Sequence, residues 1–280
     1  MTDVMPLPGV AIAVAPNGGR KTKADHPAIP LSPGELAKTA QACLEAGAAM
    51  IHAHVRKADG SHLLDADAYR EVINAVRQEV GDRLLIQITS EALGIYSPGE
   101  QIRVVKATRP EAASLAYREL VPSEDDLPAF LELLHWMKRE KVLPQIIVYD
   151  PLEAARLADL RERGDLPYKD IPVLYVLGRY TASQTSTPGD LLPFLDARQP
   201  RFSHWTACAF GRYETACLTA AALLGGNVRT GFENNTVLPD GREAPGNKAL
   251  VASLAASVNS CGIGLADADA LRAKITRSLG

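Results

Sequence analysis

The chain has 280 residues, of which 46% are hydrophobic and 22% charged, and its formal net charge is −3. Its 30 basic and 33 acidic residues are mixed along the chain, so the sequence has no basic stripe that would bind nucleic acid. The composition is that of an ordinary globular protein. No stretch approaches the ~18 uncharged apolar residues that a membrane-spanning helix needs, and the N-terminus lacks a signal pattern, so we expect a cytoplasmic protein.

Short β-rich apolar runs alternate along the chain with segments of helical periodicity. The predicted strands are Val10–Pro16, Ala48–Val55, Leu84–Thr89, Ala113–Ala116, Leu143–Tyr149, Val173–Leu177, His204–Ala209 and Asn227–Glu233. The clearest predicted helices are Pro33–Ala46, Asp65–Val80, Ser97–Ala107, Glu124–Glu140, Pro151–Arg163, Gly211–Leu224 and Lys248–Val258. Eight strand–helix units in about 250 residues are typical of a (β/α)8 TIM barrel, so we expect one α/β domain over residues 1–280. A doubly wound open sheet remains an alternative, because a count of strands does not show that the sheet closes.

The second predicted strand carries two histidines that are one residue apart. Side chains on a strand alternate between its faces, so His52, His54 and Arg56 are expected to point the same way. Two imidazoles spaced about 6.6 Å apart along a strand can converge on one divalent ion. The alternative interpretation is a pair of polar residues that make ordinary hydrogen bonds at the end of a strand.

Polar residues gather where the predicted strands end, which in a TIM barrel is the rim that carries the active site. The first strand leads into Asn17, and the third ends at Thr89. In the eighth predicted strand, the two-residue period places Arg229 and Glu233 on one face, so a guanidinium and a carboxylate are expected in the barrel mouth. A purely structural ion pair is the alternative.

The chain resembles the beta-keto acid cleavage enzymes, which are zinc-dependent TIM barrels, from about Ala15 to the final helix. Several separated motifs carry the resemblance in the same order: Thr22–Pro30, His52–Arg56, Gln87–Thr89, Val176–Gly178 and Val228–Asn235. The resemblance implies that His52, His54 and Glu233 bind one zinc ion in each subunit of a homotetramer. Two histidines and a glutamate with an open coordination position are also what coordination chemistry favours for catalytic zinc.

The reaction that this resemblance implies joins a β-keto acid to acetyl-CoA and yields acetoacetate and a new acyl-CoA. Zinc would act as a Lewis acid on the keto acid, and Arg229 matches the arginine that assists deprotonation. Thr89 and Ser114 match hydroxyl positions beside the substrate, and we add Asn17 to the candidate substrate-binding residues.

Asn234 departs from the family pattern, because the best-known member has an aspartate there as its proposed base. An amide cannot accept a proton at neutral pH as a carboxylate can. We therefore keep Asn234 among the catalytic residues, as a group that orients substrate or a water, with a turn-forming amide as the alternative. The base is left open between Glu91, Glu119, Asp150 and a zinc-bound hydroxide.

A second departure lies in the first loop, where Arg20 stands at or beside a glutamate of the member that acts on an amino-bearing keto acid. The opposite charge suggests that Arg20 pairs with the second carboxylate of a dicarboxylic β-keto acid. A solvated loop charge is the alternative. Ile147, where the same member has glutamate, is consistent with a substrate that lacks a cationic group.

Other classes of protein remain as alternatives. A metal-dependent hydrolase or an aldolase or lyase could act on a small carboxylate substrate in a TIM barrel. A hydrolase of the amidohydrolase type would carry its histidine pair on the first strand and further histidines at the ends of the fifth and sixth, where this sequence has Tyr149 and Gly178-Arg179 instead. A metal-stabilised binding protein would offer four protein ligands, whereas we find three good donors.

Overall fold

In the computed structural model, which describes residues 9–280, parallel strands close into a barrel. The order around the barrel is β1-β10-β9-β8-β7-β6-β5-β2. These strands are β1 (Ile12–Val14), β2 (Ala48–Ala53), β5 (Leu85–Thr89), β6 (Ala112–Ala116), β7 (Leu143–Val148), β8 (Val173–Leu177), β9 (Trp205–Ala209) and β10 (Asn227–Thr230). Because β1 pairs with both β2 and β10, the sheet has no free edge. The predicted TIM barrel is confirmed, and the open sheet is excluded.

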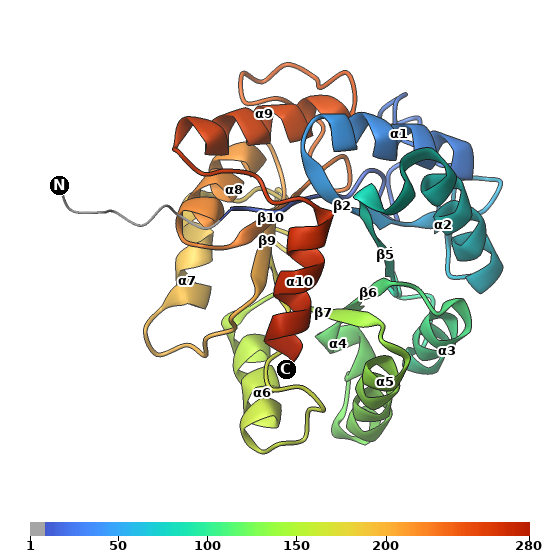
Figure 1. The fold of residues 1–280 in the computed structure, drawn as a ribbon, viewed down its shortest axis with the longest axis vertical. Coiled ribbons are helices and arrows are strands. Elements are labelled where there is room, and N and C mark those ends of the chain that lie inside the picture. Colours follow the sequence, from blue (N-terminus) through green and yellow to red (C-terminus); the bar gives the residue numbers. More distant parts are fainter. Residues whose placement is uncertain (1–8) are drawn as a thin grey trace.

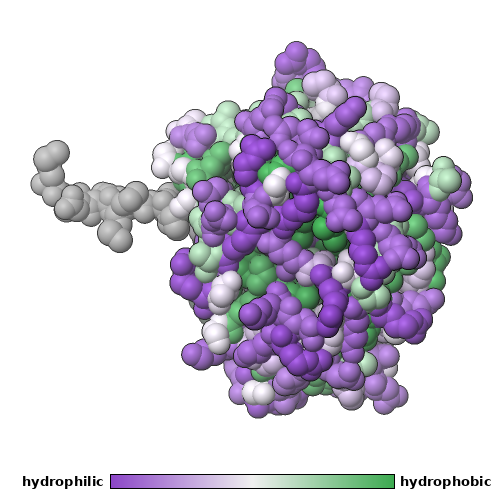
Figure 2. All heavy atoms as spheres, turned by 45° about the vertical axis from the view of Figure 1, so that its right-hand side comes forward, coloured by the Kyte–Doolittle hydropathy of each residue, from purple (hydrophilic) through white to green (hydrophobic). Residues whose placement is uncertain are grey.

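The helices surround this barrel, with the first at the upper right of Figure 1 and the last crossing in front of the strands. They are α1 (Pro33–Glu45), α2 (Ala66–Val80), α3 (Pro98–Thr108), α4 (Tyr117–Leu120), α5 (Leu127–Glu140), α6 (Pro151–Glu162), α7 (Leu192–Leu195), α8 (Glu214–Leu223), α9 (Asn247–Ser260) and α10 (Ala268–Leu279). Figure 2 shows a face covered mostly by hydrophilic residues, as expected when helices turn their apolar sides toward a barrel. Among residues 9–280, no helix is both long and apolar enough to span a membrane.

Local signals in the sequence account for where the main helices begin. The Ser32 side chain accepts a hydrogen bond from the Glu35 amide, the Glu35 side chain reaches back to the Ser32 amide, and Pro33 occupies the first turn. Ser97 and Glu100 form the same reciprocal cap on α3. These caps satisfy backbone donors that a helix N-terminus otherwise leaves unpaired.

The second predicted strand is interrupted at His54. Residues beyond it form β3 (Val55–Arg56), which pairs antiparallel with β4 (His62–Leu63) in a hairpin outside the barrel. The Arg56 guanidinium donates to the carbonyl oxygens of Gly18 and Gly60. Arg56 therefore binds the loop after β1. The three residues do not share one strand as predicted, because β2 ends at Ala53 and Arg56 lies on β3.

The two ends of the barrel differ in what covers them. Helix α10 lies across the N-terminal end, where Leu271 and Ile275 close a small cavity that His204 also lines. His204 is completely buried there, as expected for a residue at a strand start. The opposite end opens into the cavities described next.

Candidate active site

Two histidines and one glutamate meet at the C-terminal end of the barrel, as the family resemblance implies. His52 and His54 are each 1% exposed, and their Nε2 atoms are 3.1 Å apart. The Glu233 Oε2 atom lies 3.6 Å from His52 Nε2 and 3.4 Å from His54 Nε2. One ligand atom from each residue lies within 4.8 Å of the others, which is close enough for all three to hold one ion.

The free atoms and charges of this triad fit a bound cation. Arg229 donates to Glu233 Oε1 at 2.9 Å, which leaves the buried Oε2 atom without a hydrogen-bond partner. Burial lowers the pKa of His52 to about 3, so its imidazole is neutral, the form that binds metals. Burial alone would raise the pKa of Glu233, but Arg229 and the two histidines hold it well below its usual range. The donor set is therefore one carboxylate and two imidazoles, which suits a divalent ion such as zinc.

Glu233 reaches the histidines through a turn rather than from a strand. The predicted eighth strand extends to Glu233, but β10 ends at Thr230, and the amides of Asn234 and Asn235 both donate back to the Gly231 carbonyl. Arg229 and Glu233 consequently pair across one turn, four residues apart. Both side chains line the barrel mouth as predicted and also form the ion pair given as the alternative, but the predicted cause, strand alternation, is wrong.

Gly231 makes this turn possible. Its φ angle is +139°, and a Cβ atom added there would lie 2.4 Å from the Ala15 carbonyl oxygen. We expect Gly231→Ala to lower the free energy of unfolding by about 3 kcal/mol or more, because backbone strain and a steric clash add. Gly262→Ala is the matched control, since Gly262 has a φ of +79° with open space around it. Urea unfolding measures both; equal losses would contradict the role of the clash.

Glu214, the first residue of α8, is hydrogen-bonded to the same turn. Its completely buried carboxyl group accepts hydrogen bonds from the Thr230 hydroxyl at 2.8 Å, the Gly231 amide at 3.2 Å and the Asn235 side chain at 3.3 Å. Burial raises its pKa to about 8, although these donors oppose the shift. Glu214 therefore retains its proton at neutral pH while it fixes the segment that carries Glu233.

This raised pKa predicts a pH dependence of stability. Between the ordinary value of 4.5 and about 8, the folded protein holds a proton on Glu214 that the unfolded chain has lost. The free energy of unfolding should therefore fall as pH rises through this window, by up to ~1.4 kcal/mol per pH unit from this group. Glu214→Gln should remove that component, so the variant gains stability relative to the parent from pH 5 to pH 8. Urea titrations at several pH values test this, and parallel pH profiles would contradict it.

The other predicted site residues occupy different positions around the triad. Arg229 and Thr89 line an inner cavity together with the three metal-ligand candidates. Asn234 lines the outer cavity, and both polar atoms of its buried amide lack a hydrogen-bond partner. Ser114 is the neighbour of Thr89 on β6, but it is completely buried and lines neither cavity.

Asn17 also lines the outer cavity, yet its side chain is engaged by the backbone. Its amide nitrogen donates to the carbonyl oxygens of Pro30 and His54, each at 3.0 Å, and its amide oxygen accepts from the His54 amide at 3.3 Å. Asn17 therefore holds the end of β2, and with it His54, in place.

The three carboxylates considered as the base are now distinguishable. Asp150 caps α6 and pairs with Arg118, and Glu119 accepts a hydrogen bond from the Ala92 amide. Glu91 lines both cavities, and its Oε2 atom lies 3.7 Å from His54 Nδ1. Burial raises the pKa of Glu91, which strengthens its carboxylate as a base.

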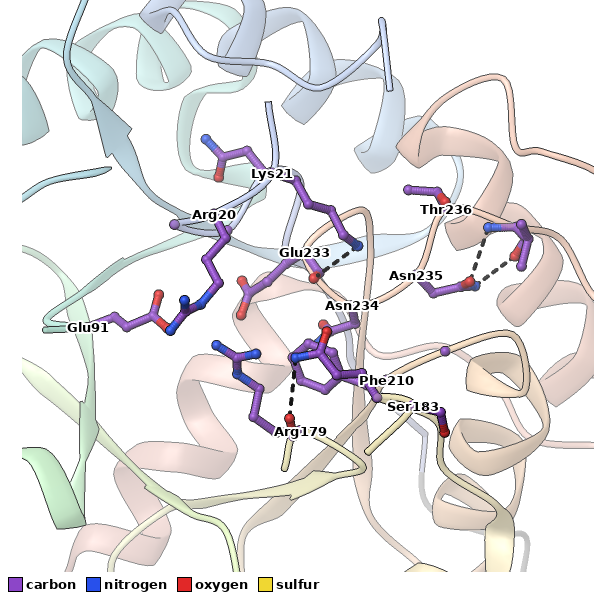
Figure 3. A pocket seen from close by; sticks show the side chains of 16 residues that line it. Arg20, Lys21, Glu91, Arg179, Ser183, Phe210, Glu233, Asn234, Asn235 and Thr236 are labelled. Atoms are coloured by element: carbon purple, nitrogen blue, oxygen red, sulfur yellow. Dashed lines mark hydrogen bonds between the residues drawn. The ribbon is translucent and has the colours of Figure 1, made fainter. Parts of the chain in front are cut away.

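The outer cavity continues outward from the triad with a volume of about 340 Å³. Figure 3 shows Arg20 and Arg179 entering it from different segments of the chain, with their guanidinium groups directed toward the space in front of Glu233. Among residues 9–280, neither guanidinium forms an ion pair, and Arg179 lies over the Phe210 ring at 5.3 Å. Arg179 was not among the predicted site residues, although a charged residue two positions after the predicted strand Val173–Leu177 was the available signal.

His62 is a second residue near the triad that has no role among the predicted site residues. It is buried on β4, with its ring centroid 5.8 Å from that of His54. Its Nε2 atom lies 2.7 Å from the Glu91 carbonyl oxygen, so the hairpin supports the segment that carries Glu91. The sequence offered no signal for this contact, because it depends on where the hairpin folds.

Comparison with known proteins identifies the family of this chain. A model of the beta-keto acid cleavage enzyme family matches residues 9–276. The chain is 29% identical over 269 residues to the 3-keto-5-aminohexanoate cleavage enzyme of Fusobacterium nucleatum, covering 93% of this chain and 95% of that one. It is 28% identical over 255 residues to the 3-oxoadipate:acetyl-CoA acetyltransferase of Cupriavidus necator, covering 88% and 87%.

Among solved structures, the fold is similar to the apo structure of ObcA, with a TM-score of 0.71 and 18% sequence identity. That alignment covers 91% of this chain and 66% of the other, so the chain spans about two thirds of the length of ObcA. At this identity the likeness concerns the fold alone. The family match, in contrast, runs over almost the whole sequence, and the chain therefore belongs to the beta-keto acid cleavage enzyme family.

Proposed function

We propose that this protein is a zinc-dependent acyltransferase that converts a β-keto acid and acetyl-CoA into acetoacetate and a new acyl-CoA. The observation that carries the proposal is the triad of the buried His52 and His54 with the partly buried Glu233, whose free carboxylate oxygen faces both imidazoles at the end of an open cavity. The family relationship and the acetyl-CoA named for the Cupriavidus necator relative support the same reaction.

The side chains of the cavity suit the first step of this reaction, loss of a proton from the carbon between the two carbonyl groups. Zinc bound by the triad would supply Lewis-acid stabilisation of the negative charge that develops on the keto acid. Arg229 is buried beside Glu233, where its permanent charge adds to that stabilisation. We assign proton removal to Glu91, the carboxylate that lines both cavities. The unpartnered amide of Asn234 then orients the substrate.

The charge of the outer cavity supports a dicarboxylic substrate. Arg20 and Arg179 lie at its wall without ion-pair partners among the residues described, and arginine binds carboxylates through paired hydrogen bonds. The Cupriavidus necator relative is named for 3-oxoadipate, which carries a second carboxylate. We therefore extend the role first suggested for Arg20 to both arginines.

The function is tested with purified, metal-analysed protein, a panel of β-keto acids and acetyl-CoA. The expected result is formation of acetoacetate together with a new acyl-CoA in equal amounts. Product that requires no acetyl-CoA would instead support a hydrolase or a lyase. No product from any member of the panel, with metal bound, would contradict the proposal.

Substrate choice is tested by truncating each arginine. We expect Arg20→Ala and Arg179→Ala to lower kcat/KM for 3-oxoadipate by ~10–100-fold, the value of a charge-assisted hydrogen bond. Turnover of 3-oxohexanoate, which has the same length but one carboxylate, should change little. Arg212→Ala is the control, because Arg212 is exposed and contacts Tyr213 instead. Equal losses on both substrates would remove the proposed role.

Some expectations stay predictions. These are a single domain over residues 1–280, zinc rather than another divalent ion, and a homotetramer. Metal analysis and light scattering coupled to size-exclusion chromatography test the last two directly.

A further inference from the structure

A chain of polar side chains crosses the interior of the barrel on the side of His52 away from Glu233. The Nδ1 atom of His52 lies 2.8 Å from Gln87 Oε1. Gln87 Nε2 donates to Gln145 Oε1 at 3.1 Å, and Gln145 Nε2 donates to Thr206 Oγ1 at 3.2 Å. The four residues belong to β2, β5, β7 and β9 and are at most 5% exposed.

This row of hydrogen-bonded polar side chains, called the polar chain below, requires an explanation. The interior of a TIM barrel is usually filled by branched apolar side chains. Buried polar groups cost stability unless they are hydrogen-bonded, and each member here is bonded to the next. Gln87, Gln145 and Thr206 line neither the inner nor the outer cavity, so contact with substrate does not account for them.

This polar chain determines which nitrogen of His52 carries the proton. A neutral imidazole carries its proton on one nitrogen and its lone pair on the other, and only the nitrogen with the lone pair binds a metal. Because Gln87 Oε1 can only accept, it fixes the proton on Nδ1 of His52. The lone pair is then on Nε2, the atom that faces His54 and Glu233.

The other members of this polar chain oppose reversal of the Gln87 amide alone. If the Gln87 amide turned over, its NH2 group would face Nδ1 and its oxygen would face Gln145 Oε1. Two acceptor oxygens would then oppose each other inside the barrel, unless Gln145 turned over as well. Because the Thr206 hydroxyl can donate as well as accept, full reversal requires both amides and this hydroxyl on a distant strand to reorient together.

We infer that Gln87, Gln145 and Thr206 are positioning residues that set the metal-binding tautomer of His52 across the barrel. The inference rests on the proposed metal site and deepens it. A metal ligand whose second nitrogen is held by a hydrogen bond typically loses ~10–100-fold in affinity when that support is removed.

The first test reads the tautomer without metal. In metal-free protein labelled with ¹⁵N-histidine, long-range ¹⁵N–¹H correlations distinguish the two tautomers, and a His52→Ala variant assigns the signal. The parent protein should show the proton on Nδ1 of His52. Gln145→Met keeps the side-chain length but removes the hydrogen bonds that join Gln87 to Thr206. It should therefore give a mixture of tautomers. An unchanged Nδ1–H signal in Gln145→Met would overturn the inference.

The second test measures zinc affinity by competition with a chromogenic chelator. Gln145→Met should bind zinc ~10–100-fold more weakly than the parent. Leu174→Ala removes an apolar side chain from the same barrel interior. Its zinc affinity should stay within about twofold of the parent, because the cavity that the substitution creates leaves the hydrogen bonds from His52 to Thr206 intact. Equal weakening in both would show a general packing effect and overturn the inference.

A pair of variants at Thr206, the last residue of the polar chain, keeps the test decisive if Gln145→Met does not fold. Thr206→Val removes the hydroxyl at nearly constant volume and should weaken zinc binding, whereas Thr206→Ser should retain it. Equal affinities of Thr206→Val and the parent, with Gln145→Met unfolded, would overturn the inference. Parent protein that binds no zinc would overturn the metal site itself, and the tautomer measurement separates that failure from this one.

Discussion

Replacing Glu233 with glutamine is expected to abolish zinc binding and to lower kcat by at least ~10³-fold, since Lewis-acid stabilisation is worth several kcal/mol. Glutamine keeps an oxygen near Arg229 but removes the negative charge that faces His52 and His54. The free energy of unfolding should also fall by about 2 kcal/mol, because the buried Arg229 loses its ion-pair partner. Metal content, acetoacetate formation and urea unfolding give the three readouts.

A double variant separates these effects. In Glu233→Gln with Arg229→Met, the unpaired charge is gone, so stability should recover while zinc binding and turnover stay lost. Chelator-treated parent protein is the second control, and it should regain activity when zinc is added back. Zinc affinity in Glu233→Gln equal to that of the parent would show that Glu233 is not a ligand, and the metal site would have to be redrawn.

Glu91→Gln should lower kcat by ~10²–10⁴-fold while zinc affinity stays close to that of the parent, because a general base contributes this range. An amide fills the same space beside His54 but cannot accept the proton. The step itself can be followed by NMR, as exchange of the C2 protons of the β-keto acid with D2O in the absence of acetyl-CoA. That exchange should be lost in the variant.

Glu119→Gln is the matched control for this experiment. Its carboxylate is bonded to the Ala92 amide and lies outside the two cavities, so exchange and turnover should change little. A different outcome for Glu91→Gln, loss of zinc affinity with a proportionate loss of turnover, would show that Glu91 orients His54 instead. The assignment of the base would then be wrong.

The strands and helices were predictable because local rules set them. The predicted strand Val173–Leu177 coincides with β8, and the predicted helix Pro33–Ala46 differs from α1 by one residue. Caps such as Ser32 act within a few residues of chain, so they are visible in the sequence. Helix α10 and the β3–β4 hairpin were not predicted, since the first covers a distant barrel end and the second consists of strands of two residues each.

The turn at Gly231 shows how two residues can be correctly placed at one cavity for a wrong reason. Strand alternation placed Arg229 and Glu233 on one face, whereas the structure joins them across a turn. An isolated glycine within a predicted strand was the signal for that break. Its effect depends on the Ala15 carbonyl oxygen, a group more than 200 residues away, which no local pattern reveals.

Residue types decided which chemistry is possible here, while folding decided which residues perform it. The closely spaced histidine pair is visible in the linear order, because ligand chemistry belongs to the side chains themselves, and the family resemblance added Glu233 to it. Closure of the sheet, the approach of Arg179 to the cavity and the polar chain from His52 to Thr206 are not legible there. They arise from contacts between segments far apart in sequence, whose geometry is set only once the barrel has formed.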